Sequence, residues 1–128
     1  MLCFNKRERL CLNNEVEYLF KQGNSFLLYP FSIRYIFKEQ REETAKVLIT
    51  CPKRYQKHAV DRNRIKRLIR ESYRKNKQPL ITFLKDECIS IDFSITFVSK
   101  DIMDYHFIEQ KLQETISMII SRYDKNKI

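Results

Sequence analysis

The stretch KRYQKHAVDRNRIKRLIRESYRKNK, residues 53–77, decides both the charge and the fold that the sequence predicts. It holds eleven Lys or Arg and two acids, a local charge of +9, which equals the formal charge of the whole 128-residue chain. The basic and acidic residues outside it therefore cancel. Concentrated positive charge costs self-repulsion in a folded protein, and it is usually tolerated because a polyanion binds there.

A helix is predicted through this stretch, from about Ala59 to Lys75. At about 100° per residue, apolar side chains gather on one face and cations on the opposite face. The apolar face consists of Ile65, Leu68, Ile69, Ser72 and Tyr73. The opposite face consists of Asn63, Lys66, Arg67, Arg70 and Arg74, with Arg62 and Arg64 at its flanks. Solvated faces normally mix charges of both signs, whereas this one does not, and guanidinium groups bind phosphate oxygens with two donors at once. The helix therefore predicts a nucleic-acid partner.

A short helix is predicted before the strands. Asn14 can cap it, and Glu17, three residues on, completes a capping box. Gly23 is placed to end the helix in the left-handed conformation. The polar segment 38–44 is expected to be a flexible connection further along the chain.

Alternating apolar residues predict a small sheet. Its strands are expected over 25–37, with a break at Pro30, and over 46–51 and 91–98. The segment after Pro79 either extends the basic helix or forms a short helix of its own. A last helix, from about Asp104, carries a core stripe of Ile108, Leu112, Thr115, Ile116, Ile119 and Tyr123. This order predicts one α+β domain over residues 1–128, ordered over about 13–123, with helices packed on a mostly antiparallel sheet.

Composition excludes several classes of protein. Gly23 is the single glycine, whereas Walker and dinucleotide-binding loops need several. The four cysteines, Cys3, Cys11, Cys51 and Cys88, lack the C-x-x-C spacing of a zinc site and suit a reducing compartment. No apolar run approaches the ~20 residues of a membrane span, and the N-terminus lacks the apolar segment of a signal peptide. We therefore expect a cytoplasmic protein with no membrane association and no metal site of its own.

No catalytic residue is predicted in the polypeptide. Neither histidine, His58 or His106, has an identifiable nucleophile and acid partner, and the carboxylates form no D-x-D pair. Aromatic residues, in contrast, are abundant, with seven Tyr and nine Phe. Alternating sheet positions cannot all be buried, so some rings should lie exposed near the cations, where they can stack on unpaired bases. RNA or another single strand is therefore the favoured partner.

Residues 58–71, HAVDRNRIKRLIRE, resemble the signature of the protein subunit of bacterial ribonuclease P. That signature centres on an Arg-Asn-Arg run, preceded by Ala-Val and followed by Ile-Lys-Arg. The resemblance covers about residues 13–123. Residues 15–23 are similar to the family's first helix, and residues 91–98 are similar to its last strand.

The resemblance implies a partner and a mechanism. The chain would assist a large catalytic RNA that removes the 5′ leader of precursor tRNA by endonucleolytic hydrolysis. Its partners would be this RNA subunit and precursor tRNA, with no protein partner required, and magnesium would be bound mainly by RNA. The resemblance also implies an α-β-β-β-α-β-α sandwich with a left-handed β-α-β crossover, which general topology rules disfavour.

Site residues follow from the signature, from Lys53 and Arg54, which resemble the family's basic pair before the signature, and from the cationic helix face. RNA binding is assigned to Lys53, Arg54, Arg62, Asn63, Arg64, Lys66, Arg67, Arg70 and Arg74. In the family, a cleft between the basic helix and the sheet takes the leader, and Phe20, Phe31 and Arg34 are the expected contacts.

Three features depart from the family pattern. Val16 stands where many members have an aromatic ring. The loop 55–57 lacks the usual glycine and is one residue longer. Pro30 interrupts the strand that would form the floor of the cleft.

Two alternative functions stay open at this point. Another RNA- or DNA-binding module, such as a ribosomal-type protein, could carry the same basic helix and would be recognised by a preference for duplex DNA over precursor tRNA. A self-sufficient nuclease would cleave its substrate without added RNA.

Overall fold

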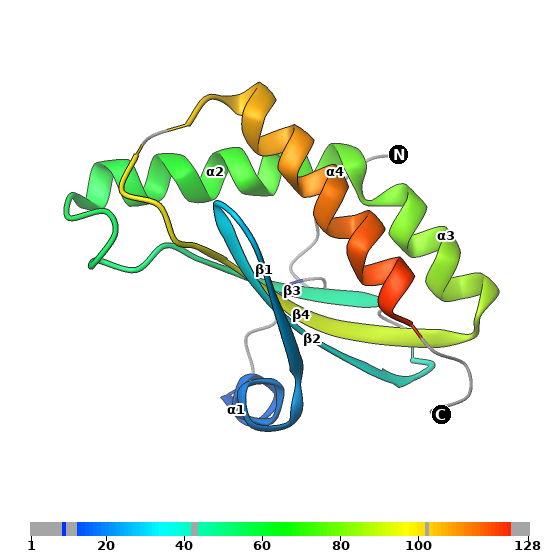
Figure 1. The fold of residues 1–128 in the computed structure, drawn as a ribbon. Helices are drawn as coiled ribbons and strands as arrows, with labels where there is room; N and C mark the ends of the chain where they lie inside the picture. Colours follow the sequence, from blue (N-terminus) through cyan, green and yellow to red (C-terminus); the bar gives the residue numbers. More distant parts are fainter. Residues whose placement is uncertain (1–8, 10–12, 42–43, 102, 124–128) are drawn as a thin grey trace.

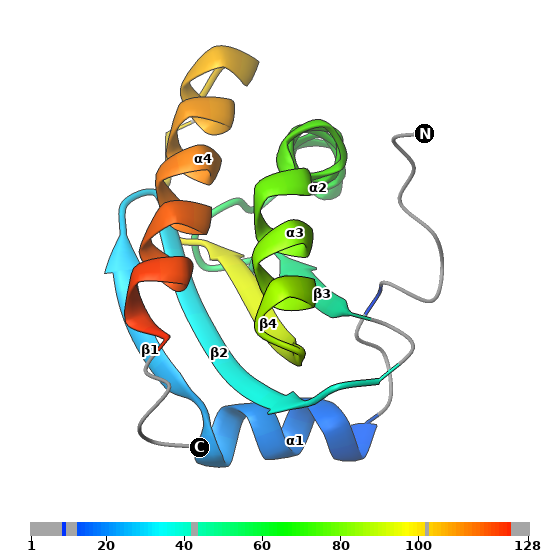
Figure 2. The same cartoon turned by 90° about the vertical axis from the view of Figure 1, so that its right-hand side faces the viewer.

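The computed structural model describes residue 9 and residues 13–41, 44–101 and 103–123. Three helices cover one face of a four-stranded sheet, and one short helix lies under the opposite face (Figures 1 and 2). The elements are α1 (Asn13–Gln22), β1 (Asn24–Leu28), β2 (Phe31–Glu39), β3 (Ala45–Thr50), α2 (Ala59–Asn76), α3 (Gln78–Asp86), β4 (Ile89–Phe97) and α4 (Tyr105–Arg122).

The sheet has the strand order β1-β2-β4-β3. β2 pairs antiparallel with both β1 and β4, whereas β3 and β4 are parallel. Parallel neighbours need a long crossover connection, which α2 and α3 supply. The mostly antiparallel α+β fold is confirmed. α3 is an additional helix, because the segment around Pro79 forms its own helix with the proline in the first turn, where a missing N–H costs nothing.

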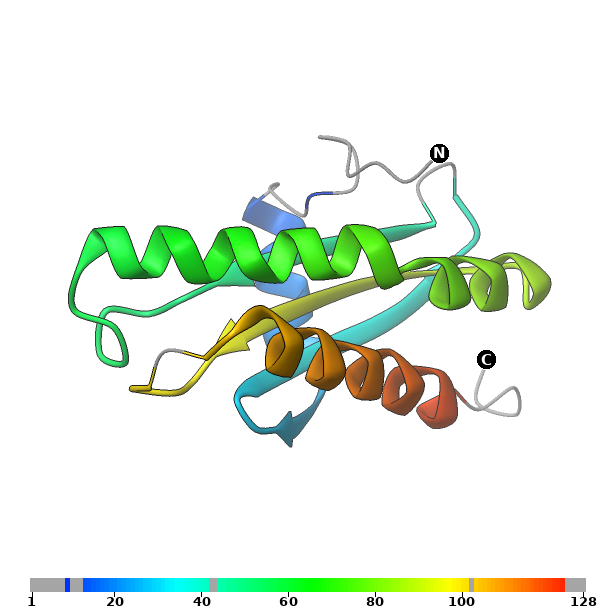
Figure 3. The same ribbon diagram turned by 90° about the horizontal axis from the view of Figure 1, so that it is seen from above.

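The apolar face of α2 packs on the sheet as predicted. Ile65, Ile69 and Tyr73 are buried, and the Tyr73 ring meets Phe93 of β4 at 5.8 Å between centroids. Figure 3 shows α2 and α4 side by side above the strands, with α3 beyond the C-terminal end of α2. The stripe predicted for the last helix is likewise buried at Ile108, Leu112, Thr115, Ile116 and Ile119. One core therefore joins α2, α3, α4 and the upper face of the sheet.

The start and end of α1 differ from the prediction. The helix begins at Asn13, so Asn14 lies inside its first turn and accepts a bond from the Glu15 N–H at 3.0 Å. Gly23 does not adopt a positive φ, so the left-handed termination was wrong. Its N–H donates to the Leu19 carbonyl oxygen at 2.8 Å, and a Cβ at this position would collide with that oxygen. Glycine is required here by the close approach of two backbone segments.

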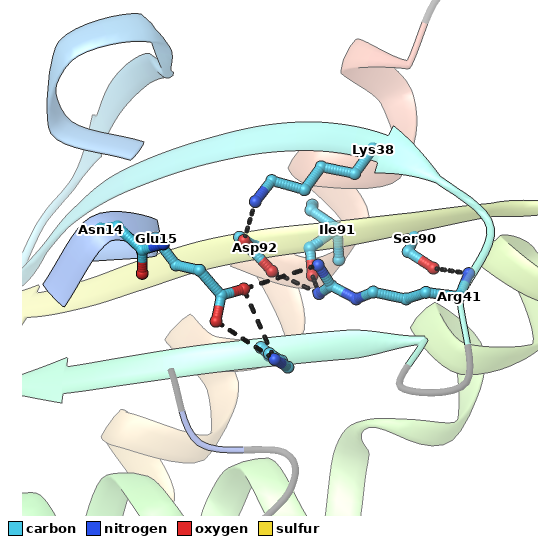
Figure 4. Close-up of polar contacts among 8 residues, drawn as sticks. Asn14, Glu15, Lys38, Arg41, Ser90, Ile91 and Asp92 are labelled. Carbon is cyan, nitrogen blue, oxygen red and sulfur yellow. Dashed lines mark hydrogen bonds and ion pairs between the residues drawn. The ribbon is translucent and has the colours of Figure 1, made fainter. Parts of the chain in front are cut away.

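Every second side chain of a strand points away from the core, toward the face of the sheet on which α1 lies. Many of these side chains are polar, and we call this face the lower face. Its central charged group is Asp92 of β4, which is 0% exposed. Lys38 Nζ lies 2.7 Å from one Asp92 oxygen, and the Arg41 guanidinium donates to the other (Figure 4). Glu15 of α1 lies 4.0 Å from Arg41 and 3.3 Å from Lys46.

These ion pairs attach α1 to the sheet and order part of a segment that was predicted to be flexible. The Arg41 N–H also donates to Ser90 Oγ at 3.1 Å, and its guanidinium donates to the Ile91 carbonyl at 3.1 Å. Residues 38–41 of the predicted connection 38–44 are therefore fixed at the end of β2, beside β4. Residues 42–43 lie outside the described part of the chain.

Asp92→Asn should destabilise the fold by about 3 kcal/mol, because it leaves two cations at a buried position without their acid. This loss of stability is at the lower end of the range of about 3–5 kcal/mol for breaking a buried ion pair, because about a quarter of the Lys38 and Arg41 side chains remains exposed to solvent. Urea unfolding followed by circular dichroism measures it. Glu114→Gln, which breaks the surface pair with Lys111, is the control and should cost under about 1 kcal/mol. Equal midpoints for the two variants would contradict the prediction.

Candidate nucleic-acid interface

The outer face of α2 carries the predicted row of cations. Arg64 and Arg67 are exposed, and Lys66 and Arg70 are half-buried. Among the described residues, none of these four forms an ion pair with an acidic side chain, so their charges are available to a partner. Asn63, between Arg62 and Arg64, is also exposed and adds an amide to the same surface.

Arg74, at the end of the predicted row, is engaged within the helix. Its guanidinium donates to both carboxylate oxygens of Glu71, at 2.6 and 3.1 Å, and Lys75 lies 3.8 Å from the same carboxylate. The hydrogen bond from Arg74 lowers the pKa of the Glu71 carboxyl. The C-terminal turn is therefore less positive than the sequence suggests, and the open cationic row ends at Arg70.

Arg62 also has an internal use. Its Nη1 donates to the carbonyl oxygens of Gln56 and Lys57, at 3.1 and 2.8 Å. This contact fastens the loop 51–58 to the first turns of α2. The predicted contacts Lys53 and Arg54 are exposed on this loop, and the Arg54 guanidinium lies 5.0 Å from the Tyr55 ring centroid. This loop leads directly into α2 (Figure 1), so the exposed cations begin on the loop and continue along the helix.

The expected cleft between α2 and the sheet is absent from the described structure, because core side chains fill that space. Phe31 belongs to this core. It is 0% exposed, and its ring meets Phe97 edge to face at 6.5 Å. Its assignment as a leader contact was therefore wrong: the alternation of β2 turns Phe31 toward the helices rather than toward solvent.

Exposed rings lie on the opposite side of the sheet, on α1. Phe20 is 43% exposed and Tyr18 is 50% exposed. Arg34 donates to the Phe20 carbonyl at 3.1 Å and places its guanidinium 5.3 Å from the Phe20 ring, and Lys38 lies 5.6 Å from the Tyr18 ring. We call these four residues the ring–cation surface. Phe20 and Arg34 were predicted, whereas Tyr18 and Lys38 were not assigned to the site.

A row of hydroxyl groups crosses the sheet beside this surface. Ser32, Thr96 and Thr50 are register partners on β2, β4 and β3, and Thr50 Oγ1 donates to Thr96 Oγ1 at 3.0 Å. All three share the strand face of Arg34 and Lys38. Because Thr50 ends β3, the hydroxyl row leads from the ring–cation surface toward Lys53 and Arg54.

The family model described as Ribonuclease P matches residues 4–120 of the chain. The chain belongs to the ribonuclease P family. It is 34% identical over 116 residues to the ribonuclease P protein component of Porphyromonas gingivalis, covering 90% of this chain and 85% of that protein. It is 32% identical over 108 residues to the ribonuclease P protein component of Borrelia duttonii, covering 84% and 88%.

Solved ribonuclease P proteins share the fold. The Staphylococcus aureus protein aligns with a TM-score of 0.66 at 22% identity, covering 91% of this chain and 98% of that one. The Thermotoga maritima protein aligns with a TM-score of 0.67 at 23% identity, covering 88% and 97%. The resemblance seen in the Arg-Asn-Arg signature is thus confirmed over nearly the whole chain.

The departures from the ribonuclease P pattern have local consequences. Residue 16 on α1 is a half-buried valine, so this position offers no aromatic ring for stacking. Pro30 lies in the turn between β1 and β2, and β2 runs unbroken from Phe31 to Glu39. The break predicted at Pro30 therefore falls between two strands, and β2 itself offers a continuous surface beside α1.

Metal and membrane features are few in the described part of the chain. No group of three or more His, Cys, Asp or Glu side chains there is placed to hold a metal ion, and no helix there is long and apolar enough to cross a membrane. Cys51 is a buried free thiol whose pKa is raised by burial, and Cys88 is an exposed free thiol. Cys3 and Cys11 lie outside the described residues.

Proposed function

We propose that this protein component of ribonuclease P binds the catalytic RNA subunit through α2 and its preceding loop, and the 5′ leader of precursor tRNA through the ring–cation surface. The role of the chain is the maturation of the 5′ end of tRNA within an endoribonuclease holoenzyme. The observation that carries the RNA-binding assignment is the cationic row from Arg64 to Arg70 on α2. Its members have no acidic partner among the described residues, and the opposite face of the helix packs in the core through Ile65, Ile69 and Tyr73.

Phosphate repulsion explains why two RNA molecules would need this row. Each cation placed against a phosphate releases a condensed counterion, and this release favours association at moderate salt. Arg64 and Arg67 can each bind phosphate oxygens with two N–H groups, which fixes orientation as well as charge.

The ring–cation surface fits a single-stranded leader. Phe20 and Tyr18 are exposed and can stack on any base. Arg34, which forms no ion pair among the described residues, stands beside Phe20 to meet a phosphate, whereas Lys38 beside Tyr18 is already paired with Asp92. Hydroxyl groups of the adjoining row can bond to phosphate or to the ribose 2′-OH. A single-stranded leader that follows the hydroxyl row would reach Lys53 and Arg54 on the loop before α2, and hence the proposed binding surface for the RNA subunit.

Magnesium is proposed to be held mainly by RNA. The ion prefers an octahedron of oxygen ligands, which carboxylates, phosphates and water supply. Near the leader surface, Glu15 and Asp92 are already paired with Lys and Arg side chains, whereas Glu17 is exposed on α1. No group of three or more His, Cys, Asp or Glu side chains is placed to hold a metal ion among the described residues, so the proposed contribution of the chain is positive charge near the RNA.

Phe20→Ala should weaken the binding of precursor tRNA by the holoenzyme by about 1–3 kcal/mol, the value of one base stacked on an aromatic ring. Mature tRNA, which has no leader, should bind as before. Equilibrium binding of both substrates to the reconstituted holoenzyme measures the difference.

The control for this experiment is Phe107→Ala. Phe107 forms a similar ring–cation pair with Lys111, at 5.5 Å, but on α4 over the other face of the sheet. It should leave both affinities unchanged. Equal losses for precursor and mature tRNA in Phe20→Ala, or a loss in the control as large as in Phe20→Ala, would count against the leader assignment.

A further inference from the structure

A chain of polar contacts ties the start of α2 to the far end of the sheet. Gln56, in the loop before α2, is 5% exposed. Its Nε2 donates to the Ser99 carbonyl at 2.9 Å and reaches the Asp101 carbonyl at 3.5 Å. Its own carbonyl accepts from Arg62 Nη1, and Ser99 Oγ lies 2.7 Å from the Tyr29 hydroxyl. The contacts thus run from α2 through the loop to the segment after β4 and the turn between β1 and β2.

The buried amide of Gln56 fixes the path of the loop. A buried polar group is costly unless it is hydrogen-bonded, so the Nε2 donor holds the loop where the Ser99 carbonyl can accept. The Gln56 and Tyr55 N–H groups both donate to the Pro52 carbonyl at 3.2 Å, which closes a tight turn. Lys53 and Arg54 project from this turn and are exposed.

We propose that Gln56 is a positioning residue for RNA binding: it sets Lys53, Arg54 and the first turn of α2 in the arrangement in which they meet phosphates. The inference rests on the proposed RNA-binding role of α2. It also gives Arg62 a second role, because one of its nitrogens holds the same loop from the helix side.

The expected signature of positioning differs from that of a direct contact. A loop that is ordered before binding loses less conformational entropy on association. Losing the order should weaken binding without changing the number of phosphates neutralised. The dependence of log affinity on log salt should therefore keep its slope while the affinity falls at every salt concentration.

Gln56→Met tests this, because methionine has a similar length and cannot donate a hydrogen bond. We expect the affinity of the chain for the ribonuclease P RNA subunit to fall about tenfold with an unchanged salt slope. Arg54→Ala should instead reduce the slope by about 0.7–0.9. In the double variant the losses should be less than additive, because a loop that lacks Arg54 has less to order on binding and the ordering cost added by Gln56→Met is therefore smaller.

Tyr29→Phe is the matched control. It removes the hydrogen bond on the other side of Ser99 while the Gln56 contacts remain, so it should lower stability and leave RNA affinity unchanged. Wild-type affinity in folded Gln56→Met, or strict additivity with Arg54→Ala, would overturn the proposal. Failure of the wild-type chain to bind the RNA subunit would instead refute the function on which it rests.

Gln56→Glu provides a second test in case the methionine variant does not fold. A carboxyl group can donate to the Ser99 carbonyl only when it is protonated, and burial favours the protonated form. The affinity of this variant relative to wild type should therefore improve as the pH is lowered from about 8 to about 6. A ratio that is constant with pH would show that the donated hydrogen bond does not position the loop.

Discussion

Purified free of RNA, the protein should leave precursor tRNA intact, and addition of the ribonuclease P RNA subunit should produce cleavage at the 5′ leader. Phosphodiester hydrolysis needs an activated nucleophile and stabilisation of the developing negative charge. The α2 face offers guanidinium and ammonium groups. These can stabilise charge, but arginine cannot act as a base because it stays protonated. A gel assay of end-labelled precursor tRNA, with and without the RNA subunit, measures the difference.

The same assay should show that the protein lowers the magnesium concentration at which the RNA subunit cleaves. Cations on α2 replace part of the ionic atmosphere that the two RNAs need, so the advantage should shrink at high magnesium or high monovalent salt. Leader removal by the RNA-free protein would refute this account and favour a self-sufficient nuclease. An advantage that is independent of salt would mean that the α2 charges are not the cause.

The double substitution Arg64→Ala with Arg67→Ala should weaken binding of the RNA subunit by about a hundredfold or more at low salt, since each charge-assisted hydrogen bond contributes about 1.5–3 kcal/mol. The salt slope should fall by about 0.7–0.9 for each phosphate that is no longer neutralised. Both side chains are exposed and lie off the buried stripe, so helix content should not change. Filter binding over a salt series, with circular dichroism, measures both quantities.

Lys85→Ala with Arg122→Ala is the matched control for this experiment. It removes the same formal charge from exposed positions on α3 and at the end of α4, away from the α2 row and from the loop before it. Its affinity and slope should stay near those of the wild type. If the two double variants lose affinity equally, net charge rather than the α2 row governs binding. Duplex DNA that competes as well as the RNA subunit would favour the alternative of a general nucleic-acid-binding module.

The basic helix could be predicted from the sequence because two local signals agree there. Ile65, Ile69 and Tyr73 recur at helical spacing, and the cations fall on the other side. Both features depend on neighbours within a few turns, so no knowledge of the rest of the fold is needed. The same reason explains why α4 and the break at Pro30 were predicted correctly.

The side chains proposed to contact the leader were harder to predict, because their exposure depends on which face of the sheet the helices cover. Alternation in β2 separates Phe31 from Arg34, but it does not say which of the two sets meets the helices. The three helices lie over the Phe31 side, so this ring is buried and Arg34 faces α1. Tyr18 and Lys38 were missed for the same reason, since their pairing joins segments that only the fold brings together.

The buried ion pairs were also beyond reach of the sequence. Asp92 lies in a segment whose sequence shows only the usual alternation of a strand. Its partners, Lys38 and Arg41, lie more than fifty positions earlier in the chain. Long-range pairs of this kind leave no periodic signal. Gly23 shows a related limit: its role comes from backbone crowding against Leu19 rather than from the local turn that glycine usually suggests.

The position of β4 in the sheet has a consequence for how the protein folds as it is synthesised. β4 lies between β2 and β3 but follows both in the chain, so β3 has no strand neighbour among β1 and β2 while β4 is still missing. A nascent chain that ends after α3 would hold a hairpin and a separate strand–helix unit. Strands that are distant in the sequence pair slowly, because closing the intervening chain into a loop costs entropy before the stabilising contacts form. The insertion of one strand therefore joins the β1–β2 hairpin to β3 and completes the sheet, on which α4 can then pack.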